Sequence, residues 1–226
     1  MPSVILDRIN SFNAAHPWSH NDFYQRWILR QLPPQLARSI DVGCGTGNLV
    51  RALAGRVDLA TGIDVDPGVI ALAREISGRS TATEFEVLGL LDAPATGQYG
   101  AVTAVAVVHH LPLLAALTHL RALLAPSGTI VIVGCYRSAT RGDRAVEAVA
   151  VVANLIMGFL LSARATTPAT DTARARDARV AMSAPTAEPE LTLAEIRAVA
   201  GRVLPGARLR RRLFWRYSLV YTEPAR

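Results

Sequence analysis

The sequence predicts an α/β fold built on a doubly wound, mostly parallel sheet with helices on both faces. Strand-like runs alternate with helix-like runs between residues 38 and 134, and such alternation with short links is typical of a parallel sheet. The strand-like runs are apolar and uninterrupted, which indicates strands buried on both faces. Two final strand-like runs are joined too tightly for a crossover, so they predict a hairpin.

The N-terminal and central elements follow from local signals. The first 35 residues are expected to form a helical, aromatic-rich cover that ends at Pro33-Pro34. Asp66 at a cap position, Pro67 after it and Gly78 at the end mark one helix. The predicted strands are 38–43, 59–64, 84–89, 101–108 and 129–134. The predicted helices between them are 48–55, 66–78 and 111–128.

An apolar run over residues 145–163 breaks this rhythm. It has about the length of a membrane span, but Glu147 and Asn154 interrupt it. We therefore expect a buried or substrate-covering helix, with membrane contact as the alternative. The residues that follow, 164–190, are rich in Ala, Thr, Pro and charge and predict an irregular insertion.

The C-terminal elements return to a regular pattern. Thr192 and Glu195 have the spacing of a capping box and mark the start of a helix over 191–206. The hairpin strands are predicted over 207–214 and 216–223.

Length and composition favour one domain in a reducing compartment. The chain of 226 residues predicts a single domain, 1–226. Its expected parts are the cover 1–35, a ligand-binding core 36–135, a substrate-covering insertion 136–190, and a last helix with the hairpin, 191–226. Cys44 and Cys135 are the only cysteines, and no signal-peptide pattern is visible, so we expect a cytoplasmic protein without a disulfide framework.

Charge excludes some chemistry. The net charge is +6, and every basic residue is arginine, so no lysine can act as a base or form a Schiff base. Arginine bias together with abundant Ala, Val and Leu fits a GC-rich genome, which weakens the case that the charge serves nucleic-acid binding. The dense basic run over 208–216 is interpreted as a solvated strand edge, with a surface for an acidic partner or RNA as the alternative. On a strand, Arg208, Arg210 and Arg212 would share one face.

The stretch SIDVGCGTGNLVRALAG, residues 39–55, carries the main functional signal. Gly43, Gly45 and Gly47 form G-x-G-x-G, whereas the dinucleotide fingerprint is G-x-G-x-x-G. Asp41 just before this loop would sit poorly beside a pyrophosphate and suits a ligand with a positive charge. Asp64, about 20 residues later, is placed to accept ribose hydroxyls. The pattern predicts a nucleoside ligand without a diphosphate.

Four sequence blocks resemble the class I S-adenosylmethionine-dependent methyltransferases: DVGCGTGNL, GIDVDPGVIALAR, VAVVHHLP and LLAPSGTIVIVG. The resemblance covers about residues 36–135, and 190–222 by architecture. It implies a Rossmann-like doubly wound sheet whose last strand inserts antiparallel. It also implies S-adenosylmethionine as the cofactor, and we expect no metal.

The resemblance assigns cofactor-binding roles to ten residues. Asp41 would orient the loop and face the amino-acid end of the cofactor, and Asp64 would hold the ribose. Leu90 stands where the family often has an acid, so Asp92 or the backbone at Leu91 would meet the adenine. The other expected contacts are Tyr24, Gly43, Cys44, Gly45, Val65 and Val107.

Methyl transfer needs a protein base only when the acceptor must lose a proton. Histidine suits that task near neutral pH. The candidates are His109 and His110, after the fourth strand, and His16 and His20, in the N-terminal cover. For the first pair the alternative is structural, with His110 capping the next helix and His109 packed.

The leading hypothesis is transfer of a methyl group to a small, largely apolar organic acceptor, in specialised metabolism. The apolar run with Met157 and Phe159 would cover such an acceptor. A nucleic-acid methyltransferase is the second hypothesis, and a protein that binds the cofactor without transferring methyl is the third. We expect a small-molecule partner, no nucleic acid and no stable membrane insertion; a homodimer stays open.

Overall fold

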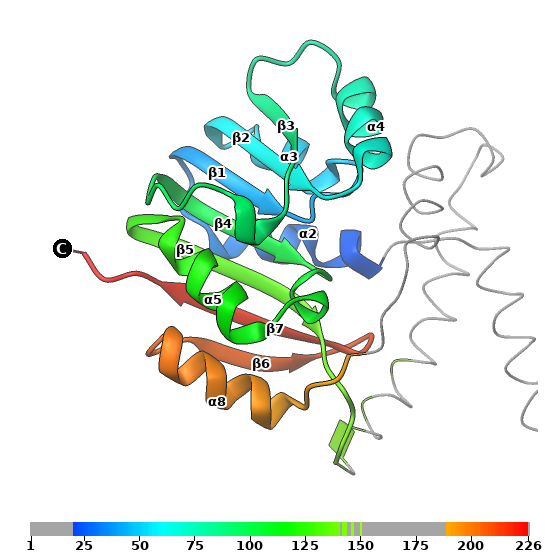
Figure 1. The fold of residues 1–226 in the computed structure, drawn as a ribbon, viewed down its shortest axis with the longest axis vertical. Helices are drawn as coiled ribbons and strands as arrows, with labels where there is room; N and C mark the ends of the chain where they lie inside the picture. Colours follow the sequence, from blue (N-terminus) through cyan, green and yellow to red (C-terminus); the bar gives the residue numbers. More distant parts are fainter. Residues whose placement is uncertain (1–19, 141, 144–145, 147–149, 151–188, 226) are drawn as a thin grey trace, which may run out of the picture. The chain divides into compact units, whose positions relative to one another are not determined.

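A computed structural model describes residues 20–140, 142–143, 146, 150 and 189–225. Its centre is one seven-stranded sheet of order β3-β2-β1-β4-β5-β7-β6 (Figure 1). The strands are β1 Leu36–Val42, β2 Val57–Asp64, β3 Thr83–Val87, β4 Tyr99–Val105, β5 Leu124–Cys135, β6 Arg208–Arg212 and β7 Arg216–Thr222. The strand order reverses direction between β1 and β4, which is where ligands bind in open α/β sheets.

The pairing pattern confirms the predicted fold class. β1 pairs in parallel with β2 and β4, and the parallel set continues to β3 and β5. β7 lies antiparallel between β5 and β6. The hairpin prediction is thus confirmed, and its second strand is the antiparallel one.

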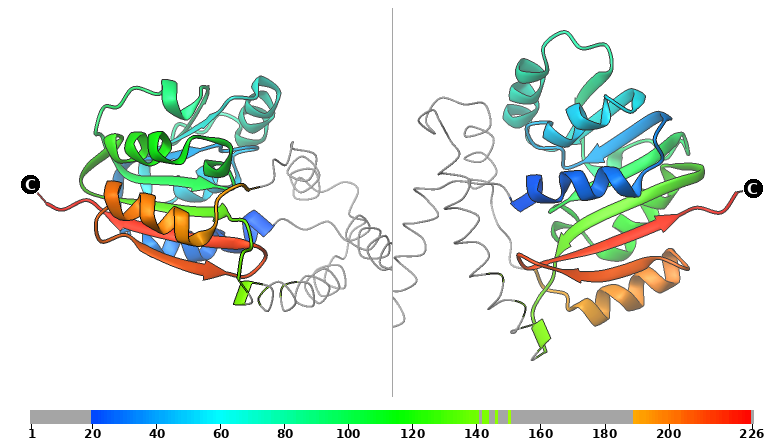
Figure 2. Two further views of the ribbon diagram at one scale, coloured as in Figure 1. Left: turned by 60° about the horizontal axis from the view of Figure 1, so that its bottom comes forward. Right: turned by 180° about the vertical axis from the view of Figure 1, so that it is seen from behind.

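Helices cover both faces of this sheet. The helices are α2 His20–Gln31, α3 Asn48–Leu53, α4 Pro67–Ser77, α5 Leu113–Ala122 and α8 Leu193–Val203, with short 3-10 turns η1 Leu90–Asp92 and η2 Val108–His110. Figure 2 shows α2 and α3 on the face opposite to α5 and α8. This division follows from right-handed crossovers, because the chain moves one way from β1 to β3 and the other way from β4 to β5.

The capping signals found in the sequence are confirmed. The Asp66 side chain accepts hydrogen bonds from the backbone N–H groups of Gly68 and Val69 at the start of α4. At the start of α8, Thr192 and Glu195 form the reciprocal capping box. Each cap satisfies backbone donors that have no partner inside the helix.

Most element boundaries differ from the prediction by one to three residues, and two differences have a clear physical reason. The predicted helix 111–128 ends at Ala122, and β5 starts at Leu124 instead of 129. Leu124 pairs with Tyr99 of β4. This strand pairing ends the helix, although apolar residues at helical spacing continue beyond Ala122. The predicted strand 101–108 ends at Val105, because Ala106 has φ +56° and leaves the extended conformation.

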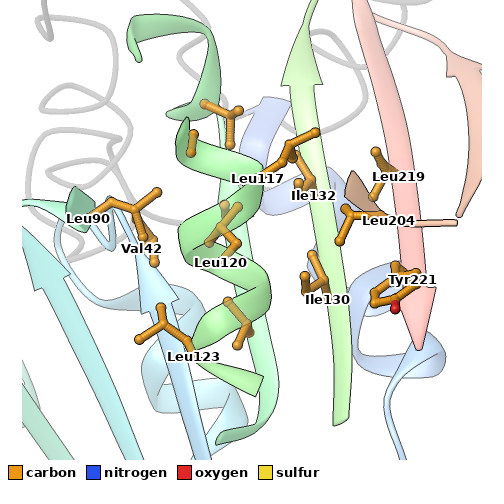
Figure 3. Close-up of a cluster of buried hydrophobic side chains, with 14 of the residues drawn as sticks. Val42, Leu90, Leu117, Leu120, Leu123, Ile130, Ile132, Leu204, Leu219 and Tyr221 are labelled. Atoms are coloured by element: carbon orange, nitrogen blue, oxygen red, sulfur yellow. The ribbon is translucent and has the colours of Figure 1, made fainter. Parts of the chain in front are cut away.

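A large apolar layer fixes the sheet against α5 and α8. Figure 3 shows part of it, in which side chains of α5 meet those of β5 and β7. Leu117, Leu120 and Ile132 are fully buried there, and Leu204 after α8 closes the layer. Such a closely packed layer gives the carboxyl ends of the strands a rigid support.

The basic run forms β6 and the start of β7. Arg208 and Arg210 are exposed on the edge strand β6. The Arg212 guanidinium lies over the Trp27 ring of α2, 4.4 Å from its centroid, and its Nε donates to Ser218 Oγ at 2.9 Å. Of the three arginines predicted to share one face, Arg212 is therefore covered by α2, whereas Arg208 and Arg210 are exposed.

The chain divides into two compact units, and the sheet belongs to the larger one. The larger unit comprises Asn21–Ser138, Ala187–Arg212 and Arg216–Arg226, and the smaller one Met1–His20, Ala139–Thr186 and Leu213–Trp215. The single-domain prediction for 1–226 stays a prediction. The predicted covering helix, apart from residues 146 and 150, and the irregular insertion fall outside the described residues. Within the part of the chain that is described, no helix has the length and apolarity needed to cross a membrane.

Candidate active site

The glycine-rich loop joins β1 to α3 and turns at glycines with positive φ. Gly43 and Gly47 are places of close approach, because an added Cβ would lie 2.7 Å from Val107 Cγ2 or 2.6 Å from the Phe85 ring. Gly45, at φ +53°, differs: its Cβ would meet no atom of the described residues within 4 Å. The loop is therefore packed on two sides and open at Gly45, where a ligand can approach the backbone.

Arg51 of α3 holds this loop in place. Its Nη1 donates to the Thr46 carbonyl at 2.7 Å and its Nη2 to Asn48 Oδ1 at 2.5 Å. Gln25 of α2 adds a hydrogen bond from Nε2 to the Asn48 carbonyl at 2.9 Å. Neither Arg51 nor Gln25 was predicted from the sequence. A polar residue on a helix has no sequence pattern that shows which loop its side chain will contact.

Asp64 at the end of β2 links the loop to the neighbouring strand. Its Oδ2 accepts the Gly45 N–H at 3.0 Å, and its Oδ1 accepts the Asp66 N–H at 3.1 Å. A carboxylate offers about four acceptor positions, so two remain for a pair of hydroxyl groups. The structure thus brings together Gly45 and Asp64, which two separate sequence signals had marked.

Asp41 at the end of β1 is a buried carboxyl group. Its Oδ1 accepts a hydrogen bond from Thr103 Oγ1 of β4 at 2.6 Å. Burial raises the pKa of Asp41 to about 7; the Thr103 hydroxyl opposes this shift and the Asp64 charge adds to it. A positive ligand nearby would favour the ionised form. Thr103 was missed because strand threonines are common.

The ends of β2 and β3 form an exposed corner. Val65 is 73% exposed and Leu91 is 42% exposed. A Cβ added to Gly89 would lie 2.9 Å from Asp92 Oδ2 and 3.6 Å from Val65 Cγ1. The structure therefore places three of the residues predicted to bind the cofactor, Val65, Leu91 and Asp92, at one corner, next to a glycine that allows the close approach of Asp92.

The turn after β4 positions Val107 and two histidines. Ala106 donates its N–H to the Val133 carbonyl at 2.8 Å, and Val107 packs against Gly43. The rings of His109 and His110 lie 4.0 Å apart. His110 does not cap α5, because the cap residue is Pro112, so the capping part of the structural alternative is wrong.

His109 is half-buried and neutral near pH 7. Burial, with smaller contributions from the nearby charges of His110 and Arg216, lowers its pKa to about 4. Its buried Nδ1 has no hydrogen-bond partner among the residues that the structure describes. A group with this pKa is a weak base, which argues against proton removal by His109 near neutrality.

Tyr24 and Cys44 are both buried and uncharged. Burial raises the pKa of Tyr24 to about 12, against the opposing influence of Arg212 and Arg216. Burial also raises the pKa of the Cys44 thiol, so Cys44 lines the loop through its backbone, whose N–H donates to the Ile63 carbonyl. His20 is the first residue of α2 and its side chain, like all of His16, lies outside the described residues.

Metal binding has no visible candidate in the described part of the chain, where no group of three or more His, Cys, Asp or Glu side chains is placed to hold an ion.

Comparison with known proteins gives a consistent result. A methyltransferase-domain family model matches residues 40–128. An uncharacterized methyltransferase of Mycobacterium tuberculosis is 27% identical over 214 residues, which are 92% of this chain and 98% of that protein. A ubiquinone biosynthesis O-methyltransferase of Xanthomonas campestris is 32% identical over 124 residues, covering 53% of this chain and 52% of that protein.

A solved structure extends the similarity to the fold. The magnesium protoporphyrin IX methyltransferase of Synechocystis PCC 6803, crystallised with bound S-adenosylmethionine, superposes with a TM-score of 0.54. The alignment covers 89% of this chain and 77% of that chain at 17% identity. The superposition shows a shared fold. Together with the methyltransferase-domain match, the relative that spans the chain and the glycine loop, it supports a class I S-adenosylmethionine-dependent methyltransferase.

Proposed function

We propose that this enzyme methylates a small, largely apolar organic acceptor at the carboxyl ends of β1, β4 and β5. The observation that carries the proposal is the open backbone at Gly45, joined by a hydrogen bond to the Asp64 carboxylate. In this proposal the cofactor-binding residues are those predicted from the sequence: Tyr24, Asp41, Gly43, Cys44, Gly45, Asp64, Val65, Leu91, Asp92 and Val107.

The residues present fit S-adenosylmethionine. A Cβ on Gly45 would fill a space that the described residues leave open, so within this part of the chain a ligand can reach the backbone there. Asp64 keeps acceptor positions for the two ribose hydroxyls. Asp41, buried behind the loop, becomes a negative charge when a cation approaches. The set suits a ligand with a sugar at one end and positive charge at the other.

The bound cofactor supplies an activated methyl group: a bond forms from the acceptor atom to the methyl carbon, the carbon–sulfur bond breaks, and its electron pair stays on sulfur. The chain's own residues bind and orient. Arg51 and Asp64 keep the loop in one conformation, and Val107 fixes the turn after β4 against Gly43. Holding two reactants in line accounts for a large part of such a rate increase.

A small-molecule acceptor is supported by the Xanthomonas relative, whose name gives ubiquinone biosynthesis as its role. The basic run does not require nucleic acid. Arg208 and Arg210 lie exposed on the edge strand β6, where charged side chains commonly protect against pairing with another strand.

Calorimetric titration with S-adenosylhomocysteine tests the site. Gly45→Leu fills the open space, so we expect at least about a 100-fold loss of affinity, as for a site blocked by steric overlap. Gly78→Leu is the matched control, because Gly78 has φ +60°, an equally open Cβ direction and a place at the far end of α4. Equal binding by both variants, or wild-type binding of NAD in place of S-adenosylhomocysteine, would overturn the assignment.

Acceptor class is tested separately. The enzyme is incubated with S-adenosylmethionine that carries a radiolabelled methyl group, together with either a small-molecule cell extract or total RNA. The label transferred to each sample is measured. We expect label in apolar small molecules; label in RNA alone contradicts the proposal.

A further inference from the structure

Thr103 lies beside Asp41 in the middle of the sheet. The two residues are register partners of the parallel strands β4 and β1, and such partners project from the same face of a sheet. Thr103 is fully buried, and Asp41 is 3% exposed. Both residues belong to the larger unit. The Asp41 carboxyl group therefore meets the Thr103 side chain inside the protein, away from bulk water.

The Thr103 hydroxyl donates a hydrogen bond to this carboxyl group. Its Oγ1 lies 2.6 Å from Asp41 Oδ1 and 3.4 Å from the Ile40 carbonyl oxygen. A hydroxyl has a single proton to donate, and the shorter contact is the stronger one. In the described part of the chain, Thr103 is the one residue that donates a hydrogen bond to the Asp41 side chain.

The other neighbours of Asp41 do not favour its charged form. On the β2 side its register partner is Gly62, which has no side chain, and a Cβ there would lie 2.9 Å from Cys44 Sγ. The Cys44 thiol is uncharged near neutrality, because burial raises its pKa. The Asp64 charge at the end of β2 raises the pKa of Asp41, whereas the Thr103 hydroxyl lowers it.

We propose that Thr103 is a positioning residue of the cofactor site. Its hydroxyl holds the Asp41 carboxyl group in place and favours the charged form, and it thereby sets the pH range in which the enzyme binds its cationic cofactor. The inference rests on the proposed function, since it concerns the same site. Thr103 is fully buried, so it acts through Asp41. A hydrogen bond to the ionised form of an acid promotes ionisation.

Binding of S-adenosylmethionine by Thr103→Val tests this role. Valine has the shape of threonine without the hydroxyl, so Asp41 should ionise about one pH unit higher than in the wild type. With wild-type ionisation centred at about pH 7, half of the Asp41 groups are charged at that pH, against about a tenth in the variant.

The expected loss therefore depends on pH. Calorimetry should show about fivefold weaker binding by Thr103→Val at pH 7, and binding within about twofold of the wild type at pH 8.5, where Asp41 is charged in both proteins. A purely structural defect would not recover at the higher pH. An equal loss of affinity at both pH values, or no loss at either, overturns the proposal.

Two further variants assign the effect to the hydroxyl group. Thr103→Ser keeps the hydroxyl and should restore the wild-type pH profile. Thr129→Val is the matched control, because Thr129 is a buried strand threonine whose Oγ1 lies 3.2 Å from Thr222 Oγ1, and its strand β5 is not a neighbour of β1. It should bind like the wild type. A serine variant with the valine profile, or the same pH-dependent loss in Thr129→Val, contradicts the inference.

Carbon NMR of the Asp41 carboxyl group gives a readout that needs no Thr103 variant to fold. In protein with carboxyl-labelled aspartate, the Asp41 signal is identified by its absence from Asp41→Asn. We expect this signal to titrate at about pH 7 in the wild type, and at lower pH with S-adenosylmethionine bound, because a nearby cation favours the charged form. Titration at about pH 4, the ordinary range of an aspartate, or a titration that the cofactor leaves unchanged, would be incompatible with the proposal.

Binding by the wild type separates this inference from the proposed function. If the wild type binds S-adenosylhomocysteine and Thr103→Val shows the wild-type pH profile for S-adenosylmethionine, only the role of Thr103 is refuted. If the wild type binds neither ligand at any pH, the proposed function is wrong and this inference falls with it.

Discussion

The two halves of the sheet's carboxyl edge differ in charge and in construction. On the β1–β2 side, Asp41 and Asp64 place carboxyl groups around the glycine loop. On the β6–β7 side, Arg212 ends β6 and Arg216 begins β7, and the charges of both act on Tyr24. The two halves of this edge therefore present opposite charge, which would orient a charged ligand before any close contact forms.

The largest expected effect comes from adding a methyl group beneath each half. In Gly62→Ala, the Cβ would lie 2.8 Å from Val50 Cγ2 and 2.9 Å from Cys44 Sγ. In Gly134→Ala it would lie 2.6 Å from the Tyr217 ring. Overpacking of this kind costs about 1–3 kcal/mol, measured as the free energy of unfolding in urea.

Binding should separate these two variants. Gly62→Ala should weaken S-adenosylhomocysteine binding, and Gly134→Ala should leave it within about twofold, a difference well below 1 kcal/mol. Gly201→Ala, in α8 with nothing within 4 Å of its Cβ, is the control and should gain about 0.5–1 kcal/mol in stability. If Gly134→Ala damaged cofactor binding as much as Gly62→Ala, the two halves would not be independent.

Next in size is the loss of the Asp64 charge. Asp64→Asn should weaken S-adenosylhomocysteine binding about 10–100-fold, because hydrogen bonds to an ionised acceptor contribute about 1.5–3 kcal/mol. Asp66→Ala, two residues away, removes the α4 cap and should cost about 1 kcal/mol of stability without changing affinity. Calorimetry and urea unfolding on both variants check the contrast; affinity loss in Asp66→Ala alone would contradict it.

A smaller effect is expected from pH. With its pKa at about 7, Asp41 is mostly protonated below neutrality and ionised above it. Affinity for the cationic S-adenosylmethionine should therefore rise up to about tenfold between pH 6 and pH 8, where a factor of ten matches one pKa unit. Asp41→Asn, which keeps an acceptor for Thr103, should flatten this dependence. A flat profile in the wild type would show that Asp41 does not sense the ligand's charge.

The smallest effect concerns the turn between the halves. Ala106 has φ +56°, a conformation that glycine adopts at lower cost. Ala106→Gly should raise stability by up to about 1 kcal/mol and leave binding in both halves unchanged. Thermal unfolding is the measurement, and a loss of stability would mean that the Ala106 methyl group packs favourably.

The sequence marked the residues of the acidic half through a local motif, whereas Cys135 and Arg216 in the basic half were not marked as site residues. Gly43, Gly45 and Gly47 lie within five consecutive residues, and Asp64 follows at a recognisable spacing, so a local motif is enough to mark this half. Tyr24, His109, Cys135 and Arg216 come from four elements far apart in the chain. No local pattern joins them, and Arg216 looked like part of a basic run.

Fold prediction shows the same limit. Helix starts with side-chain caps, at Asp66 and Thr192, were located from the sequence. The end of α5 was not located. Leu124 leaves the helical pattern because it pairs with Tyr99 of β4, and the spacing of apolar residues in the helix does not indicate this pairing.

The anchoring of the glycine loop has a consequence for turnover. Arg51, Gln25 and Asp64 hold its backbone through hydrogen bonds from within the protein. Little entropy is then lost when the donor arrives, and the spent product can leave without the loop melting. S-adenosylmethionine should therefore bind to a preformed loop after each turnover. The rate of cofactor exchange would then be set by the dissociation of S-adenosylhomocysteine.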